Sequence, residues 1–342
     1  MTGGTVTFAV PDPDNELSGV RLVQDVRIPG DQLCFRWSGG RWVLVIAKPP
    51  VSRMEYLLEF SSPAGGSWTG LDPGNPRTVD GAFGPKSVLE FPGYVPPGWL
   101  AEPGQPGNNV TLDVPARPVD AVISCRVWTP ADAGDDEPLP LLLAHDGPEY
   151  DVLSKLTGYL SSGVTGGWLP RMRAALLSPG PRDRWYSANA GYAQALRQSV
   201  IPALAGRFAT KVRVGMGTSL GALAMLHAHC KYPDSFDALF LQSGSFFWSQ
   251  FDSQERRFPY YRRIVTFVSS VRAGRLLGKP VPVALTCGVI EENLANNQAM
   301  TSVLIELGYQ ASLREVPDVH NYTAWRDSFH PDLTELLNRA GS

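Results

Sequence analysis

The sequence predicts a two-part chain, with an all-β N-terminal segment followed by a domain of mostly parallel strands between helices. The first third carries short runs of β-branched and aromatic residues bounded by Gly, Pro or Asp, and no helical periodicity. A stretch rich in Gly and Pro follows, and from about residue 119 apolar strands alternate with helical segments. We therefore expect a β-sandwich over residues 1–117 and an α/β domain over residues 118–342.

The N-terminal segment contains several short strand candidates, which suit two small packed sheets. They fall at residues 6–10, 20–26, 33–37, 42–46 and 54–60. Residues 92–118 then form the Pro-rich and Gly-rich connector between the two domains.

The second part alternates strands and helices, and its strands are nearly continuous apolar runs. Such strands are buried on both faces, which is typical of a parallel sheet covered by helices. The strands are predicted at residues 121–129, 139–144, 173–177, 211–216, 238–242, 281–287 and 311–316. The helices are predicted at residues 192–208, 220–231, 259–273, 294–307 and 323–339.

Charge and composition narrow the classes of partner. The formal net charge is −3, so the whole chain has no electrostatic preference for nucleic acid or an anionic membrane. A basic cluster at Arg256, Arg257, Arg262 and Arg263 has two explanations, a solvated helix face or a rim that attracts an anionic substrate.

Targeting and redox features are few. The N-terminus has no basic segment followed by an apolar run, and no apolar stretch approaches the roughly 20 residues of a membrane helix. The cysteines at 34, 125, 230 and 287 lack CxxC spacing and are expected to be small buried residues. Cytoplasmic residence is the default expectation.

A catalytic motif lies where a buried strand meets an Ala-rich and Leu-rich helix. Residues 217–221 match G-x-S-x-G, with Ser219 at the centre. The chemistry needs a sharp strand-to-helix turn, because glycines on both sides relieve clashes while the hydroxyl is presented at a helix N-terminus. The Leu220 N–H is then the first oxyanion donor. The alternative is a strand–helix turn with an incidental serine. The motif in this context predicts the α/β-hydrolase fold, with Ser219 as nucleophile.

A serine nucleophile needs a base, and the chain has five histidines. His227 and His229 lie beyond the serine on the following helix, and their spacing puts the rings on different faces. His145 precedes the nucleophile, which is the wrong chain order for this fold. His330 falls inside the predicted last helix. His320 follows the last predicted strand and is therefore the expected base.

The third member of a triad orients the imidazole and should follow the strand at 281–287. That loop contains two adjacent carboxylates, Glu291 and Glu292. We expect Glu291 to be the acid and keep Glu292 in reserve. The alternative for either residue is a solvated position at a helix start.

Three segments resemble the enterochelin (enterobactin) esterases, within the esterase-D-like group of α/β-hydrolases. The first runs from the elbow through 232–236 to the QSGSF stretch at 242–246. The second is Glu291 followed by Asn-Gln-Ala at 297–299, and the third is His320 with Trp-Arg at 325–326. The N-terminal third looks more loosely like the sandwich domain that precedes the hydrolase domain in siderophore esterases.

The resemblance also implies binding residues. Residues 182–189 resemble an arginine-bearing loop that lies beside the catalytic serine in the family. Because Pro148 has no N–H, the second oxyanion donor must be the Glu149 N–H or a side chain of Arg182 or Arg184. Candidate pocket aromatics, with ordinary core as the alternative, are Trp185, Tyr186, Phe246, Phe247 and Trp248.

The expected function is hydrolysis of an ester-linked siderophore or similar bulky acyl ester through an acyl-enzyme, without metal or organic cofactor. The expected partner is a small-molecule ester, in one version a ferric siderophore. Two alternatives are acyl transfer to a sugar, as in mycolyltransferases, and a non-catalytic ligand-binding protein.

Overall fold

The computed structural model describes residues 4–26, 28–276 and 278–341. Its contacts divide the chain into two compact units. The first comprises the chain up to Val95 together with two short segments, Gly288–Glu291 and Pro317–Asn321. The second comprises Pro96–Cys287, Glu292–Val316 and Tyr322–Ser342.

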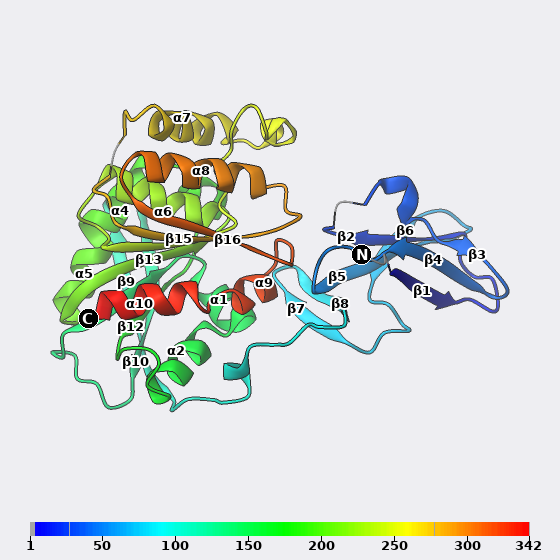
Figure 1. Ribbon diagram of the computed structural model, residues 1–342, viewed down its shortest axis with the longest axis horizontal. Helices are drawn as coiled ribbons and strands as arrows, with labels where there is room; N and C mark the ends of the chain where they lie inside the picture. The colour runs from blue at the N-terminus through cyan, green and yellow to red at the C-terminus, as the bar shows by residue number, and fades with distance from the viewer. Residues whose placement is uncertain (1–3, 27, 277, 342) are drawn as a thin grey trace. The chain divides into compact units, whose positions relative to one another are not determined.

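The first unit is a β-sandwich (Figure 1). One sheet has the order β1-β4-β3, with β1 (Thr5–Pro11), β4 (Arg41–Ala47) and β3 (Arg36–Trp37) antiparallel. The other has the order β2-β5-β8-β7, with β6 paired to β5; its strands are β2 (Gly19–Gln24), β5 (Arg53–Ser61), β6 (Ser67–Gly70), β7 (Thr78–Gly81) and β8 (Gly84–Glu90). A short 3-10 helix, η1 (Gly30–Leu33), precedes β3. Alternate residues of both sheets point inward and form one core.

Two distant loops complete that core. Val319 is buried in it, and Ile290 packs against it from the other segment. The loops that follow β15 (Pro282–Gly288) and β16 (Gln310–Val316) therefore belong to the sandwich unit rather than to the unit that contains most of their own strands. This assignment places the predicted base and acid in the first unit.

The second unit contains an eight-stranded sheet with the order β16-β15-β14-β13-β11-β12-β10-β9. The remaining strands are β9 (Gly107–Ala116), β10 (Ala121–Pro130), β11 (Leu139–Ala144), β12 (Arg173–Leu177), β13 (Thr210–Thr218) and β14 (Ala238–Gln242). Strands β11 to β15 pair in parallel, whereas β10 is antiparallel to both β9 and β12. The carboxyl ends of β11, β13, β14 and β15 consequently lie at one edge of the sheet.

Helices cover both faces of this sheet (Figure 1). One face carries α4 (Ala190–Ala195), α5 (Ile201–Arg207), α6 (Leu220–Lys231), α7 (Tyr261–Arg272) and α8 (Leu294–Glu306). The other carries α1 (Gly147–Ser154), α2 (Leu156–Thr165), α9 (Tyr322–Asp327) and α10 (Asp332–Gly341). Shorter elements are α3 (Arg182–Tyr186), η2 (Gly98–Leu100), η3 (Arg117–Val119), η4 (Leu196–Val200) and η5 (Ser253–Arg257).

The structure differs from the expectations in several details. The contacts divide the chain at Val95, not at 117, because β9 pairs with β10 along its whole length and belongs to the larger sheet. The helix expected at 192–208 is interrupted by a π-helical turn, η4, and the one expected at 323–339 is two helices separated before Asp332. Of the cysteines, Cys34 is exposed and the other three are buried.

Candidate active site

Ser219 sits in the sharp turn between β13 and α6. Its backbone has φ 54° and ψ −122°, a region that a residue with a Cβ rarely adopts. The turn is held on both sides, since the Ser219 N–H donates to the Gln242 carbonyl at 2.9 Å and the Ser219 carbonyl accepts from the Ser245 N–H at 3.1 Å. The Ser219 hydroxyl lies 3.1 Å from the Ser245 hydroxyl. A strained backbone held in this way presents the side chain at the N-terminus of a helix.

Two of the expected oxyanion donors lie at starts of helices on this edge. Leu220 is the first residue of α6, so its N–H has no acceptor within the helix. Glu149 lies in the first turn of α1, after β11, which is hydrogen-bonded to β13. Pro148 precedes it and supplies no N–H. The Glu149 Oε2 atom is buried and has no hydrogen-bond partner among the described residues.

His320 and Glu291 form a pair within the first unit. The His320 Nδ1 atom lies 2.8 Å from Glu291 Oε2, and the Glu291 side chain is 2% exposed against 35% for the imidazole. The other carboxylate oxygen accepts the Gly288 N–H at 2.8 Å. A carboxylate only accepts hydrogen bonds, so this contact places the imidazole proton on Nδ1. The other ring nitrogen, Nε2, is then the basic one. Glu292, the reserve candidate, is exposed.

Arg182, on the loop after β12, is held by a buried carboxylate. Its Nε and Nη2 atoms donate to the two carboxylate oxygens of Asp146 at 2.8 and 2.9 Å. Asp146 follows β11 and is buried. Burial lowers the pKa of the Arg182 guanidinium, but the Asp146 charge and hydrogen bonds outweigh it, so the net direction is upward. Two of the five N–H donors are used in this fork, which orients the remaining ones.

Arg184, the other candidate of this loop, is exposed, and its backbone carbonyl accepts a hydrogen bond from Arg263 Nη2 at 2.6 Å. Arg263 Nε also donates to the Ser187 carbonyl. Arg263, on α7, thus holds the arginine-bearing loop (residues 182–189) through these two hydrogen bonds. The other members of the basic cluster, Arg256, Arg257 and Arg262, are exposed.

The segment that follows β14 is held by hydrogen bonds to buried asparagine side chains. Asn297 on α8 accepts from the Gly244 N–H at 3.0 Å and donates to its carbonyl at 2.9 Å. Asn293 donates to the Ser243 carbonyl at 3.1 Å. The Ser243 backbone has φ 48°, and Trp325 Nε1 donates to its hydroxyl at 3.0 Å. This network holds the segment that supports the Ser219 turn.

His145 is buried beneath the turn rather than available to it. Its Nδ1 atom lies 2.9 Å from the Gly221 carbonyl, which only accepts, so Nδ1 carries the proton. Burial lowers the pKa of His145 to about 4, which keeps the ring neutral. Burial lowers the pKa of His227 likewise, to about 4. His229 contacts the Lys279 carbonyl, away from the turn.

Most of the candidate pocket aromatics lie in the core. Trp185 is 4% exposed and stacks on Tyr192 at 5.4 Å between ring centroids, and Tyr186 is fully buried. Phe246 and Phe247 are also buried. The burial of these four side chains favours the alternative that they belong to the ordinary core. Trp248 is half-buried and packs between Phe251 and the Arg272 guanidinium.

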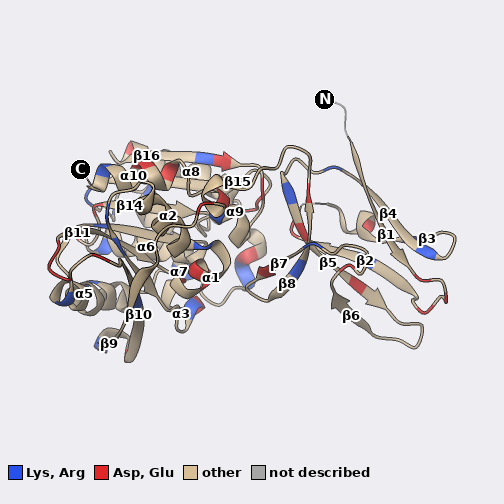
Figure 2. Ribbon diagram, turned by 90° about the horizontal axis from the view of Figure 1, so that it is seen from below, with Lys and Arg blue, Asp and Glu red and all other residues tan. Residues whose placement is uncertain are grey.

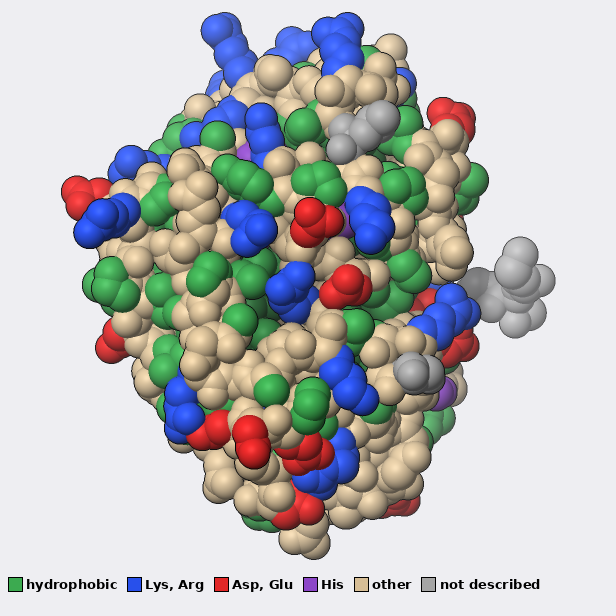
Figure 3. All heavy atoms as spheres, turned by 90° about the vertical axis from the view of Figure 1, so that its left-hand side faces the viewer, with side chains coloured by type: hydrophobic (Ala, Val, Ile, Leu, Met, Phe, Trp, Pro, Cys, Tyr) green, Lys and Arg blue, Asp and Glu red, His purple; other side chains and the backbone are tan. Residues whose placement is uncertain are grey.

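Charges of both signs are mixed on the strands and helices of each unit (Figure 2). On the face drawn in Figure 3, Lys and Arg gather at the top edge, where α7 lies in Figure 1. The local basic character therefore belongs to the α7 region. This is the helix whose Arg263 holds the arginine loop.

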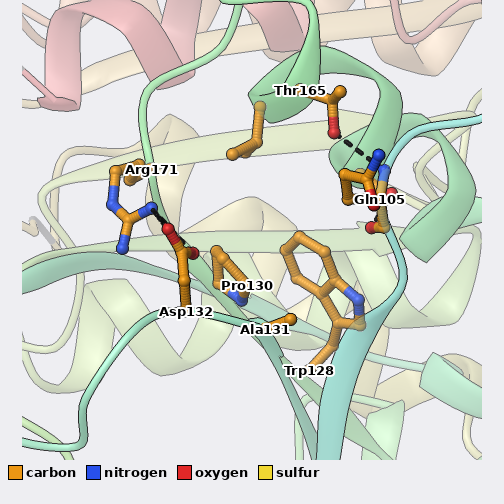
Figure 4. A pocket seen from close by; sticks show the side chains of 9 residues that line it. Gln105, Trp128, Pro130, Ala131, Asp132, Thr165 and Arg171 are labelled. Carbon is orange, nitrogen blue, oxygen red and sulfur yellow. Dashed lines mark hydrogen bonds and ion pairs between the residues drawn. The ribbon is translucent and has the colours of Figure 1, made fainter.

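A pocket of about 360 Å³ lies where β10 ends, beside the first residues of β12 (Figure 4). It is bounded by the end of β10, by α2 and by the segment before β12. Arg171 on its wall is bound to Asp132 and Glu137, each by paired hydrogen bonds. None of the predicted site residues lines this pocket.

Across 4–26, 28–276 and 278–341, no cluster of three or more His, Cys, Asp or Glu is arranged to hold a metal ion. Over the same ranges, no helix combines the length and apolar character that crossing a bilayer requires.

Residues 123–336 match the model of the Esterase family, which is more than half of the chain. The chain belongs to the Esterase family.

Curated relatives point in the same direction. The chain is 27% identical over 229 residues to the iron(III) enterobactin esterase of Dickeya dadantii, covering 62% of this chain and 51% of the relative. It is 26% identical over 290 residues to the iron(III) enterobactin esterase of Escherichia coli K12, covering 78% of this chain and 66% of the relative. The aligned part thus spans between half and two thirds of these relatives.

Solved structures of the same group share the fold. The ferric enterobactin esterase of Salmonella typhimurium matches with a TM-score of 0.78 at 21% identity, covering 97% of this chain and 93% of that one. The Shigella flexneri enterobactin esterase, solved in the presence of enterobactin, matches at 0.77 and 20% identity, covering 98% and 92%. The fold is that of the α/β-hydrolases, preceded by a β-sandwich.

Sequence reasoning missed two carboxylates that hold candidate residues of this Esterase-family chain. They are Asp146, which directly precedes Gly147, and Asp318, two positions before His320. A carboxylate directly after a buried strand was the available sign for Asp146. Its pairing with Arg182, 36 positions away, is a long-range contact that a single sequence does not display.

Proposed function

We propose that this chain is a serine esterase that hydrolyses an ester-linked siderophore, or a similarly bulky acyl ester, through an acyl-enzyme. The observation that carries the proposal is the backbone of Ser219, at φ 54° on the N-terminus of α6. Strained backbone of this kind is concentrated at active sites, and here it coincides with a helix N-terminus and a G-x-S-x-G turn, which supports a nucleophilic role for Ser219. The curated relatives are iron(III) enterobactin esterases, which supports a siderophore ester as the substrate class.

In the proposed mechanism His320 accepts the Ser219 proton at Nε2 while Glu291 stabilises the imidazolium through Nδ1. Ser219 Oγ attacks the ester carbonyl, and the alcohol leaves with the proton returned by His320. Water then repeats the sequence and releases the acid.

The proposed oxyanion donors are the Leu220 N–H together with Arg182 or the Glu149 N–H. Arg182 is favoured over Arg184 because Asp146 orients it and because Arg184 is exposed. No step requires a metal or an organic cofactor. Cytoplasmic residence stays a prediction.

The test is turnover of p-nitrophenyl butyrate and of iron(III) enterobactin by the wild type and by Ser219→Ala. We expect the alanine variant to lose activity on the order of a thousandfold or more. A fluorophosphonate should label Ser219, and the Ser245→Ala variant should still be labelled at Ser219.

Full activity of Ser219→Ala, or no turnover by the wild type, would contradict the proposal. Mass spectrometry of the products separates the alternatives. An acylated sugar would indicate an acyltransferase, and binding of an intact siderophore without turnover would indicate a binding protein.

A further inference from the structure

A buried charged pair lies on strand β5 of the sandwich, on the side opposite to its core. Strand alternation sends Met54 and Tyr56 into the core and Arg53 and Glu55 to the other face. Yet Arg53 is 3% exposed and Glu55 is 4% exposed. Arg53 Nη1 donates to Glu55 Oε1 at 2.8 Å. Burying a charged pair is costly, so a face that does so needs an explanation beyond the stability of the sandwich.

A third buried charge faces this pair from the loop that carries His320. Asp318 is 6% exposed. Burial raises the pKa of its carboxyl to about 7, and the nearby Arg53 charge opposes that rise. The positive charge of Arg53 is in turn favoured by both Glu55 and Asp318. Arg53 thus pairs directly with Glu55 on β5 and attracts the Asp318 charge on the His320 loop at longer range.

The Asp318 carboxylate binds on both sides of His320. Its Oδ1 atom accepts from the Val319 N–H at 2.8 Å and from Asn321 Nδ2 at 3.3 Å. The Asn321 N–H donates to the Val319 carbonyl at 2.9 Å, which closes the turn. The Asp318 carboxylate therefore helps to hold the turn that carries the His320 imidazole.

Backbone contacts join this turn to its neighbours. The Ser52 N–H, beside Arg53, donates to the Pro317 carbonyl at 2.7 Å. A Cβ on Gly288 would lie 2.3 Å from the Asp318 carbonyl oxygen, so the start of the Glu291 loop packs directly on the His320 loop. Val319 is buried in the sandwich core. The imidazole and its carboxylate partner are thus built into one body with β5.

We propose that Arg53 is a positioning residue, which holds the His320 turn through Asp318 and so makes the N-terminal sandwich part of the catalytic apparatus. This inference rests on the proposed function, in which His320 is the base. It assigns the N-terminal domain a role in forming the base–acid pair, beyond any contact with substrate.

The test compares Arg53→Met and Asp318→Asn with a matched control, Tyr56→Phe. The control also removes a buried polar interaction of β5, since Tyr56 Oη donates to Asp72 Oδ2 at 2.7 Å, but it does not touch the His320 turn. Arg53→Met removes the positive charge and keeps the length of the side chain. Asp318→Asn keeps the acceptor for the Val319 N–H and removes the charge that Arg53 attracts.

We expect both test variants, measured at about pH 8 with p-nitrophenyl butyrate, to lower kcat by about tenfold or more with KM nearly unchanged. Tyr56→Phe should leave kcat unchanged even where it lowers the melting temperature equally. The hydrogen-bonded proton on His320 Nδ1 should give a downfield NMR resonance, which is assigned by its absence in His320→Gln. We expect this resonance to be absent in Arg53→Met and present in Tyr56→Phe.

An unchanged kcat and an unchanged resonance in a folded Arg53→Met would overturn the inference, as would an equal loss in the control. If Arg53→Met does not fold, Asp318→Asn decides by the same criteria. The resonance is measurable without substrate. An inactive wild type that is not labelled at Ser219 would therefore refute the proposed function, while the NMR comparison would still decide the role of Arg53.

Discussion

Gly217 and Gly221 meet across the turn that carries Ser219. A Cβ built on Gly217 would lie 2.5 Å from the carbonyl carbon and oxygen of Gly221, which is closer than any side chain can approach. A Cβ on Gly221 would in turn lie 3.2 Å from the His145 Cβ. The turn therefore requires a glycine at position 217, whereas a side chain at position 221 would be tight against His145.

Gly217→Ala should displace the Ser219 turn and lower kcat by about a hundredfold or more, because the nucleophile moves relative to its oxyanion donors. Ester turnover and fluorophosphonate labelling measure the effect. Gly206→Ala is the control, since a Cβ there meets nothing within 4 Å. It should leave turnover unchanged and stabilise the fold by up to about 1 kcal/mol. Equal turnover by both variants would argue against Ser219 as nucleophile.

Glu291→Gln should lower kcat by about a hundredfold to ten-thousandfold, with little change in stability. The glutamine carbonyl can still accept the Gly288 N–H, but its NH₂ group would face His320 Nδ1 and favour the wrong tautomer. Glu292→Gln, at an exposed position, should keep full activity. Steady-state kinetics of the two variants decides between the adjacent carboxylates, and the reverse result would make Glu292 the acid.

The fold was predictable where local pattern and tertiary structure agree. The apolar runs at 139–144, 173–177 and 238–242 are buried strands of the sheet because nothing but a two-sided interior accommodates such runs. The G-x-S-x-G stretch predicts the Ser219 turn because the turn itself requires the glycine at position 217.

Contacts between distant positions were not predictable. Trp185 is an aromatic residue of the kind that lines pockets, but its stacking on Tyr192 in the core depends on how α4 folds back on α3. In the same way, the loop with Val319 follows a strand of the larger sheet, yet it completes the core of the sandwich. A single sequence carries periodicity and local geometry, and neither specifies which surface a loop will cover.

Arg182→Gln should lower kcat by about tenfold to a thousandfold through loss of an oxyanion donor, whereas Arg184→Gln should stay within about twofold of the wild type. Arg182→Gln also leaves Asp146 buried without its partner. We expect it to lose about 1–3 kcal/mol of stability, less than a fully buried pair would, because a third of the Arg182 side chain is exposed.

The double variant Arg182→Gln, Asp146→Asn separates the two effects. It leaves no buried charge, so urea denaturation should show recovered stability while turnover remains low. Recovered turnover would mean that Arg182 acts only through the fold.

Acid should destabilise the fold through two buried histidines. The pKa values of His145 and His227 are lowered by burial from 6.5 to about 4. At these two positions the unfolded chain therefore binds more protons than the folded one between about pH 6.5 and 4, so their contribution to the free energy of unfolding falls as the pH falls through that window and is constant above it. Asp318, whose pKa is raised to about 7 by burial, contributes with the opposite sign. At about pH 4.5 each histidine should account for roughly 2–3 kcal/mol.

His227→Phe tests this directly. His227 packs edge-on against Phe267 with 4.9 Å between ring centroids, and a phenyl ring keeps that contact without taking up a proton. Urea denaturation at about pH 7 should give near wild-type stability, whereas at about pH 4.5 the variant should be more stable than the wild type. Phe267→Leu is the control and should lower stability equally at both pH values, because no titrating group is removed. If His227→Phe keeps the wild-type pH dependence, His227 is not held neutral by burial in the folded protein.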